Sequence, residues 1–215
     1  MYFKYGKKEI AYLKEKDKKL GAVIDKIGII KRDIDDNLFT ALVHNIVGQQ
    51  ISNKALDTIW KRLQDTYKNI EPKTLNLASI EELKAIGISS RKGEYIKDFC
   101  KKIISGDFQL EAIKKMSDED AIQTLSSLKG VGVWTAEMIL LFCLQRPNVL
   151  SYNDLAIQRG MRMVYHHKKI DKKLFEKYRK RLSPYCSVAS LYFWSVAGGS
   201  IPEMKDYAQK ETSRT

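Results

Sequence analysis

Cysteine is scarce in this 215-residue sequence, which has only Cys100, Cys143 and Cys186. These residues are far apart and form no Cys-x-x-Cys pair, so the spacing gives neither a zinc knuckle nor the four-cysteine set of an iron–sulfur cluster. A free cysteine behaves as a small apolar side chain and is readily buried. We therefore expect three reduced, packed thiols and no metal site.

Long apolar runs are also missing. No stretch of about 18 uncharged apolar residues occurs, so we expect no membrane span. The N-terminal stretch MYFKYGKKEIAYLKEKDKK lacks the apolar segment of a secretory signal peptide. Together with the reduced thiols, these absences predict a cytoplasmic protein.

Helix breakers are few, with four prolines and twelve glycines, and no stretch alternates with a period of two. Apolar residues instead recur at three- and four-residue spacing in a series of amphipathic segments. The first of these is 38–47 and the last is 185–197. Ser79, with Glu82 three positions on, forms a capping box before a short helix, and Ser117 is expected to cap another. We predict an all-α protein with about nine to eleven helices.

The charge balance is strongly basic. The sequence has 38 lysine and arginine residues against 26 aspartate and glutamate residues, which gives a formal net charge of +12. Because neutralisation of phosphates drives non-specific nucleic-acid binding, this surplus favours a polyanionic partner. A lysine-rich proteome also produces basic proteins without that function, so the charge alone does not decide.

The stretch LKGVGVWTAEMILLF, residues 128–142, places a glycine-rich turn directly before an apolar helix. Glycine allows a sharp turn and leaves backbone N–H groups open to a ligand. The following helix adds its unpaired N-terminal N–H groups and the positive end of its dipole. We expect the turn to hold an anion such as a DNA phosphate, and the alternative is a tight turn that only permits close packing. The residues concerned are Lys129, Gly130, Val131 and Gly132.

Three further segments surround this turn: ALVHNIVGQQIS before it, and SYNDLAIQRG and SPYCSVASLYFW after it. The four segments, in this order and over residues 38–197, resemble the motifs of the helix-hairpin-helix (HhH-GPD) superfamily of DNA base-excision glycosylases. The last segment is similar to the late helix of the 3-methyladenine DNA glycosylase II branch. Cys186 stands where that branch usually has an arginine, so any salt bridge of that arginine is absent here or supplied elsewhere.

The resemblance implies a single two-lobed helical unit over residues 1–215, with the active site in the cleft between the lobes. One lobe would contain residues 38–150, and the other would combine residues 1–37 with residues 151–215. The implied protein is a monomeric enzyme of base excision repair that binds double-stranded DNA containing a damaged base and no membrane. Such an enzyme would be associated with the nucleoid in a prokaryotic cell.

Asp154 in SYNDLAIQRG matches the catalytic aspartate of the superfamily. Cleavage of the N-glycosidic bond builds positive charge on the deoxyribose, which a carboxylate stabilises while it orients or deprotonates the attacking water. The alternative is a helix N-cap, because aspartate is favoured at the position before LAIQRGM. The two roles are compatible, since a cap holds its side chain rigidly at the mouth of a helix.

Trp134 distinguishes two reaction types within the resemblance. Members that also cleave the strand carry a lysine two positions after the second hairpin glycine, where its amine forms a Schiff base. Tryptophan at this position implies a monofunctional glycosylase that uses water and excises alkylated purines, with deaminated purines as a second class. An 8-oxoguanine-type glycosylase with lyase activity and a non-catalytic helix-hairpin-helix DNA-binding protein are the alternatives.

Trp134, Trp194 and Tyr152 are expected to line the base pocket. An alkylated purine is electron-poor and cationic, and a cation over an aromatic face gains about 0.5–2 kcal/mol. Trp194 matches a second pocket aromatic of the branch, whereas Tyr152 has less motif support. Ordinary core packing is the alternative for each aromatic side chain.

Gln49 and Gln50 end an apolar helix, where two amides are unusual choices for burial. The resemblance assigns Gln50 to the gap left by the flipped base, with Gln49 in support, and the alternative is a pair that simply faces water. Arg91 and Lys92 in SSRKGEY are similar to a backbone-contacting loop, and solvated surface charge is an equal alternative.

Hydrolysis by water requires no cofactor. The resemblance allows one monovalent cation at the hairpin, beside the bound phosphate. No iron–sulfur cysteine set follows the catalytic segment, which excludes the endonuclease III type.

Overall fold

The computed structural model describes residues 1–208 as helices joined by short turns. Thirteen helices lie in this part of the chain, and its isolated β-bridge pairs Tyr2 with Asp33. The prediction of an all-α protein is confirmed. None of the helices among residues 1–208 is long and apolar enough to cross a membrane. Residues 209–215, the end of the second expected lobe, lie outside the described part.

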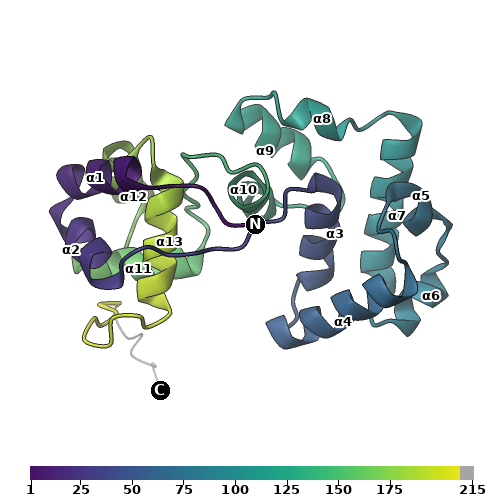
Figure 1. Ribbon diagram of the computed structural model, residues 1–215, viewed down its shortest axis with the longest axis horizontal. Helices are drawn as coiled ribbons and strands as arrows, with labels where there is room; N and C mark the ends of the chain where they lie inside the picture. Colours follow the sequence, from purple (N-terminus) through teal and green to yellow (C-terminus); the bar gives the residue numbers. More distant parts are fainter. Residues whose placement is uncertain (209–215) are drawn as a thin grey trace, which may run out of the picture. The chain divides into compact units, whose positions relative to one another are not determined.

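The chain forms two compact units. The first unit combines Met1–Asp33 with the described part of Gln145–Thr215, so both ends of the chain build it. Its helices (Figure 1) are α1 (Lys7–Lys16), α2 (Lys18–Ile27), α11 (Leu155–Tyr165), α12 (Lys172–Leu182) and α13 (Cys186–Ala197). The second unit is the continuous segment Ile34–Leu144. Its helices are α3 (Leu38–Gly48), α4 (Asn53–Thr66), α5 (Pro72–Leu77), α6 (Ile80–Ala85), α7 (Ser90–Ser105), α8 (Leu110–Ile113), α9 (Asp118–Ser126) and α10 (Val133–Phe142).

In the first unit, α11 and α13 approach each other very closely. Gly160 of α11 faces the backbone of α13, and a Cβ atom at this position would lie 2.2 Å from the carbonyl oxygen of Phe193. The helix α13 is apolar almost throughout and buries most of its residues, and α2 packs against it with Leu20 and Val23 buried. Because this packing fixes α11, the turn that precedes α11 is anchored where it joins this helix.

In the second unit, α7 is the helix against which α3, α5 and α6 pack. Phe39 of α3 stacks on Phe99 of α7 with ring centroids 5.4 Å apart, and Phe108 contacts the edge of Phe99. Aromatic pairs of this kind add to the apolar area that the helices bury. The end of α3 is therefore held against α7.

The expected caps are confirmed, but the expected helix count was too low. Ser79 accepts a hydrogen bond from the Glu82 N–H at 3.1 Å and donates its own N–H to the Glu82 carboxylate at 2.7 Å. Ser117 caps α9 in the same way by accepting from Asp120 N–H. The additional helices α5 and α8 have six and four residues, too few to show a periodic apolar stripe. The N-terminal region also contains two helices, because Asp17 ends α1 and caps α2.

Candidate functional site

The glycine-rich turn joins α9 to α10 in the second unit. Gly130 has a φ of 80°, a left-handed conformation that favours glycine. Val131 donates its N–H to the carbonyl of Leu128 at 3.1 Å, and its side chain is buried. Gly132 is the N-cap of α10, and no atom lies within 4 Å of the position that a Cβ would take. The turn is therefore tight at Gly130 and open at Gly132.

The open side of this turn is suited to an anion. Gly132 has no side chain that could cap α10, so the first N–H groups of that helix are not used by their own N-cap. The positive end of the helix dipole lies at the same point. The amine of Lys129 lies 3.0 Å from the Asp98 carboxylate, so its charge is partly balanced by an internal partner. The role of Lys129 in DNA binding stays a prediction.

The two glutamines at the end of α3 have different surroundings. The Gln49 amide donates from Nε2 to the carbonyl oxygen of Gly130 at 2.5 Å, and the side chain is half-buried. Gln50 is exposed and has a φ of 57°, which is uncommon for a residue other than glycine. Non-glycine residues in this conformation cluster at functional sites. Gln49 is thus engaged inside the protein, and Gln50 is presented to the outside.

Arg91 and Lys92 lie in the first turn of α7, in the second unit. Arg91 is exposed, whereas the Lys92 amine donates to the carbonyl of Val47 at 2.7 Å, near the end of α3. Burial, and then the neighbouring Arg91 charge, lower the pKa of Lys92. Arg91 is available to a ligand, and Lys92 mainly fixes the carbonyl end of α3.

Asp154 is the N-cap of α11, in the first unit. Its Oδ1 accepts hydrogen bonds from the N–H groups of Ala156 and Ile157, each at 2.9 Å. The residue is only 7% exposed. The capping role expected from the sequence is therefore confirmed, and two backbone donors fix the direction of the carboxylate. Such an acid is positioned to act on a neighbouring charge without first rearranging.

The three candidate pocket aromatics lie on different elements. Trp134 is the second residue of α10 and is 44% exposed, which is a large fraction for an indole that only fills a core. Trp194 is half-buried on α13, the helix that packs against α11. Tyr152 is half-buried just before α11, and its ring meets the edge of Phe175 with centroids 5.1 Å apart. Tyr152 therefore has a packing role of its own in the first unit.

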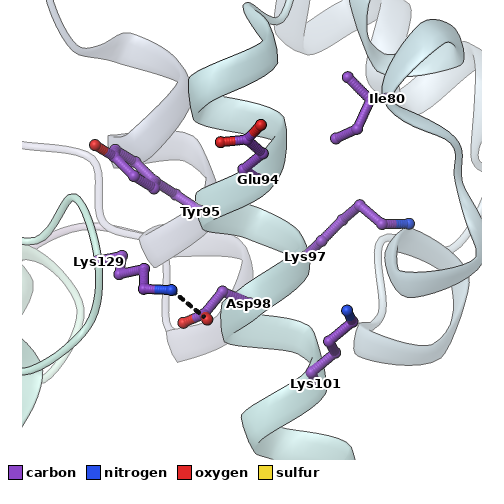
Figure 2. Close-up of a pocket in the computed structure, with 7 residues that line it drawn as sticks. All are labelled: Ile80, Glu94, Tyr95, Lys97, Asp98, Lys101 and Lys129. Atoms are coloured by element: carbon purple, nitrogen blue, oxygen red, sulfur yellow. Dashed lines mark hydrogen bonds and ion pairs between the residues drawn. The ribbon is translucent and has the colours of Figure 1, made fainter.

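Tyr95 and Asp98, both on α7, belong to the surroundings of the hairpin, although sequence analysis did not identify them. A Cβ on Gly130 would lie 2.3 Å from Cδ2 of Tyr95, so the ring occupies the space that a side chain would need. Figure 2 shows Asp98 paired with Lys129, at a pocket that Tyr95 also lines. Hydrogen bonding to Lys129, followed by Lys102, lowers the pKa of Asp98 despite some burial. Asp98 also pairs with Lys102 four positions on, but no local pattern links Tyr95 and Asp98 to the hairpin, because Gly130 and Lys129 lie more than 30 residues further along the chain.

Within residues 1–208, no group of three or more His, Cys, Asp or Glu side chains could hold a metal ion. Cys100, Cys143 and Cys186 are free and buried, which confirms the expectation of packed thiols. Burial raises the pKa of each thiol to about 12.

Comparisons with known proteins give matches over most of the chain. The pattern of the HhH-GPD superfamily of base excision DNA repair proteins matches residues 43–184. A DNA-3-methyladenine glycosylase 1 from Schizosaccharomyces pombe is 30% identical over 164 residues, which cover 74% of this chain and 72% of that protein. The match thus extends from α3 to the turn before α13.

Solved structures show the same fold. A DNA-3-methyladenine glycosidase from Bacillus halodurans has a TM-score of 0.84 and 34% identity, with 95% of each chain covered. A 3-methyladenine DNA glycosylase from Schizosaccharomyces pombe, in complex with abasic DNA, has a TM-score of 0.78 and 26% identity. That comparison covers 89% of this chain and 97% of the other.

Proposed function

Because the chain belongs to the HhH-GPD superfamily of base excision DNA repair proteins, we propose that it is a monofunctional DNA glycosylase of the 3-methyladenine type. It acts as a monomer on double-stranded DNA and hydrolyses the N-glycosidic bond of an alkylated purine flipped out of the duplex. Deaminated purines form a second substrate class. The observation that carries the proposal is the buried carboxylate of Asp154, fixed by two backbone N–H groups at the start of α11.

The proposed role of Asp154 follows from its fixed charge. Departure of the base leaves positive charge on the deoxyribose, and an ionised carboxylate nearby lowers the energy of that state. The same carboxylate orients the attacking water or accepts its proton. Because Oδ1 already receives two N–H groups, the carboxylate does not need to reorient during the reaction. Electrostatic stabilisation of this preorganised kind is usually the largest single contribution to catalysis.

The proposed route uses water because Trp134 occupies the position of the Schiff-base lysine. The exposed Trp134 indole offers an aromatic face to a cationic, alkylated base. Trp194 contributes a second aromatic surface, and Tyr152 supports the turn that carries Asp154 through its contact with Phe175.

The proposed grip on DNA comes from the second unit. The N–H groups at the start of α10 bind a backbone phosphate, and Arg91, an exposed residue of the same unit, adds a positive charge. Gln50, exposed and in a left-handed conformation, enters the duplex in place of the flipped base. These contacts position the damaged strand without reading its sequence.

The proposed reaction needs no cofactor, because the nucleophile is water. A monovalent cation at the hairpin would be held by backbone carbonyl groups of the turn. The Gly130 carbonyl already accepts a hydrogen bond from Gln49, so only its second lone pair would be open to such a cation. Affinity for duplex DNA measured in potassium and in tetramethylammonium salts of equal ionic strength would test whether a small cation contributes.

Replacement of Asp154 by asparagine tests the catalytic proposal. Asparagine caps helices as well as aspartate does, so the variant should keep its fold and its binding to DNA that contains a methylated purine. Loss of the charge should reduce single-turnover excision about 100-fold or more. Asp171→Asn is the matched control, because Asp171 caps α12 in the same unit with a hydrogen bond from Leu174 N–H at 2.8 Å. Excision at the wild-type rate by Asp154→Asn would refute the role.

Two further measurements separate the alternatives. Borohydride treatment during reaction with lesion DNA should trap no covalent adduct, whereas a glycosylase with lyase activity would form one. A non-catalytic DNA-binding protein would release no base from any substrate. Oligonucleotides that each carry one lesion, namely 3-methyladenine, 7-methylguanine, ethenoadenine or hypoxanthine, would define the substrate range.

A further inference from the structure

Three side chains from α3 and α7 fix the hairpin within the second unit. Gln49, at the end of α3, donates to the carbonyl of Gly130 at 2.5 Å. Tyr95 of α7 packs against the same glycine, where a Cβ would lie 2.3 Å from its ring. Asp98, one turn further along α7, holds the Lys129 amine at 3.0 Å. The hairpin is therefore tied to α3 and α7 through its two successive residues Lys129 and Gly130.

The α7 side chains involved follow one stripe of that helix. Lys92, Tyr95 and Asp98 are three residues apart and so succeed one another along one face. Lys92 reaches the carbonyl of Val47 at the end of α3, whereas Asp98 reaches the hairpin. Figure 2 shows Tyr95 and Asp98 projecting from α7 toward the side from which Lys129 approaches. The stripe thus contacts both elements that the proposed function assigns to DNA.

Gln49 links these two elements directly. It is followed by Gln50, whose left-handed backbone persists only where the surrounding structure fixes it. The bond from Gln49 to Gly130 joins residues 81 positions apart and supplies such a constraint. It also determines the peptide between Gly130 and Val131, since Gln49 holds its carbonyl and Leu128 accepts its N–H. The amide that follows, at Gly132, therefore faces a preset direction.

We propose that Gln49 is a positioning residue whose amide ties the Gln50 turn to the hairpin, so that both elements meet the duplex as one rigid piece. This inference rests on the proposed function, and it gives Gln49 an internal role rather than a contact with DNA. A preset group binds better than a mobile one because no ordering cost accompanies binding. Without Gln49, the Gly130 carbonyl loses a partner and the peptide is held only through the Val131 N–H.

A double-mutant cycle between Gln49→Ala and Gly132→Ala tests the proposal. Binding is measured by fluorescence anisotropy on an undamaged duplex at one salt concentration, because affinity for DNA depends strongly on salt. Gln49→Ala should weaken binding by about 5- to 10-fold, as expected for one lost hydrogen bond. In the Gly132→Ala background it should add little, because both changes act on the hairpin. Losses that multiply, or wild-type affinity of Gln49→Ala, would overturn the proposal.

Gln49→Glu provides a readout that a purely structural role would not change. A carboxylate is similar in size to the amide but cannot donate to the Gly130 carbonyl, so binding at pH 7.5 should be weak. Protonation restores an O–H donor. The affinity of Gln49→Glu relative to wild type should therefore rise as the pH falls toward about 5, near the range in which glutamate takes up a proton. A ratio that is constant with pH would contradict the proposal.

Thermal melting of each variant shows whether the fold is intact. If Gln49→Ala does not fold, the pH dependence of Gln49→Glu carries the test alone. Failure of this proposal is distinguishable from failure of the proposed function, because binding to undamaged DNA requires no catalysis. Excision of methylated bases together with multiplying losses would overturn only the role of Gln49. A non-additive cycle in a protein that releases no base would support Gln49 and overturn the glycosylase activity.

Discussion

Replacement of Gly132 by alanine separates the role of the hairpin in DNA binding from its role in the fold. Gly132 has a φ of −94°, which alanine adopts readily, and the new methyl group would meet no atom within 4 Å. Alanine is a poorer N-cap than glycine by roughly 0.5–1 kcal/mol, while restriction of the unfolded chain stabilises by about 0.4–1 kcal/mol. The two effects nearly cancel, so the free energy of unfolding should change by less than about 0.5 kcal/mol.

DNA binding should respond differently to the same change. The methyl group would project into the open space beside the first N–H groups of α10, where we expect the phosphate. Loss of one hydrogen bond to a charged group costs about 1.5–3 kcal/mol. This corresponds to roughly a 10- to 150-fold increase in Kd. The dependence of log Kd on log salt should also fall by about one phosphate contact.

Replacement of Gly130 by alanine, in contrast to that of Gly132, should destabilise the fold. A left-handed φ of 80° costs alanine about 1–2 kcal/mol, and the new Cβ would lie 2.3 Å from the Tyr95 ring. Displacement of that ring adds an overpacking cost of about 1–3 kcal/mol. The free energy of unfolding should therefore fall by about 2–5 kcal/mol, and the melting temperature with it.

Circular dichroism melting and anisotropy at two salt concentrations measure both effects. Gly6→Ala is the matched control, because Gly6 is the N-cap of α1 and a Cβ there would also meet nothing within 4 Å. It should leave DNA affinity unchanged. A folded Gly132→Ala variant with wild-type affinity would refute the phosphate role of the hairpin. Equal melting temperatures for Gly130→Ala and Gly132→Ala would refute the geometry of the turn.

Three further predictions concern stability and reactivity. Gly160→Ala should lower the free energy of unfolding by about 2–3 kcal/mol, because the new Cβ would lie 2.2 Å from the Phe193 carbonyl oxygen; an unchanged melting temperature would contradict the close helix crossing. The buried cysteines, with pKa values of about 12, should react with iodoacetamide at pH 8 much more slowly in native protein than in denaturant, and rapid native labelling would disprove their burial. Hydrogen bonding to Arg162 lowers the pKa of Asp206 below its ordinary value of 3.8, so this carboxylate stabilises the fold above that value and the contribution disappears as the pH falls through the folded-state pKa. Asp206→Asn should accordingly lower the melting temperature at pH 7, and this deficit should shrink as the pH falls through the folded-state pKa; a deficit that does not change with pH would exclude the ion pair as the cause.

Much of the fold could be predicted from local patterns in the sequence. The capping box at Ser79 and Glu82 and the cap at Ser117 depend on residues three positions apart, and the structure confirms them. The helices α5 and α8 could not be predicted because they are too short for a period to be visible. Their formation depends on burial of Leu75 and Ile113 against the rest of their unit.

The candidate site likewise has a part that local sequence specifies and a part that depends on contacts between distant residues. The cap made by Asp154 is local, and its two hydrogen bonds reach only two and three residues ahead. The catalytic role of this carboxylate, the pocket role of Trp134 and the insertion of Gln50 stay predictions until the variants are measured. Lys92 and Lys129 show what local patterns miss, since the amine of each has an internal partner in another element.

The sequence by itself determined the helical class, the glycine turn before α10 and the aspartate at the start of α11, because short-range backbone and capping preferences specify them. Only the tertiary structure decided that Gln49 donates to Gly130, that Tyr95 occupies the space beside that glycine, and that Asp98 holds Lys129. Those partners are separated by 31 to 81 residues, so the packing of α3, α7 and α10 within their unit brings them together.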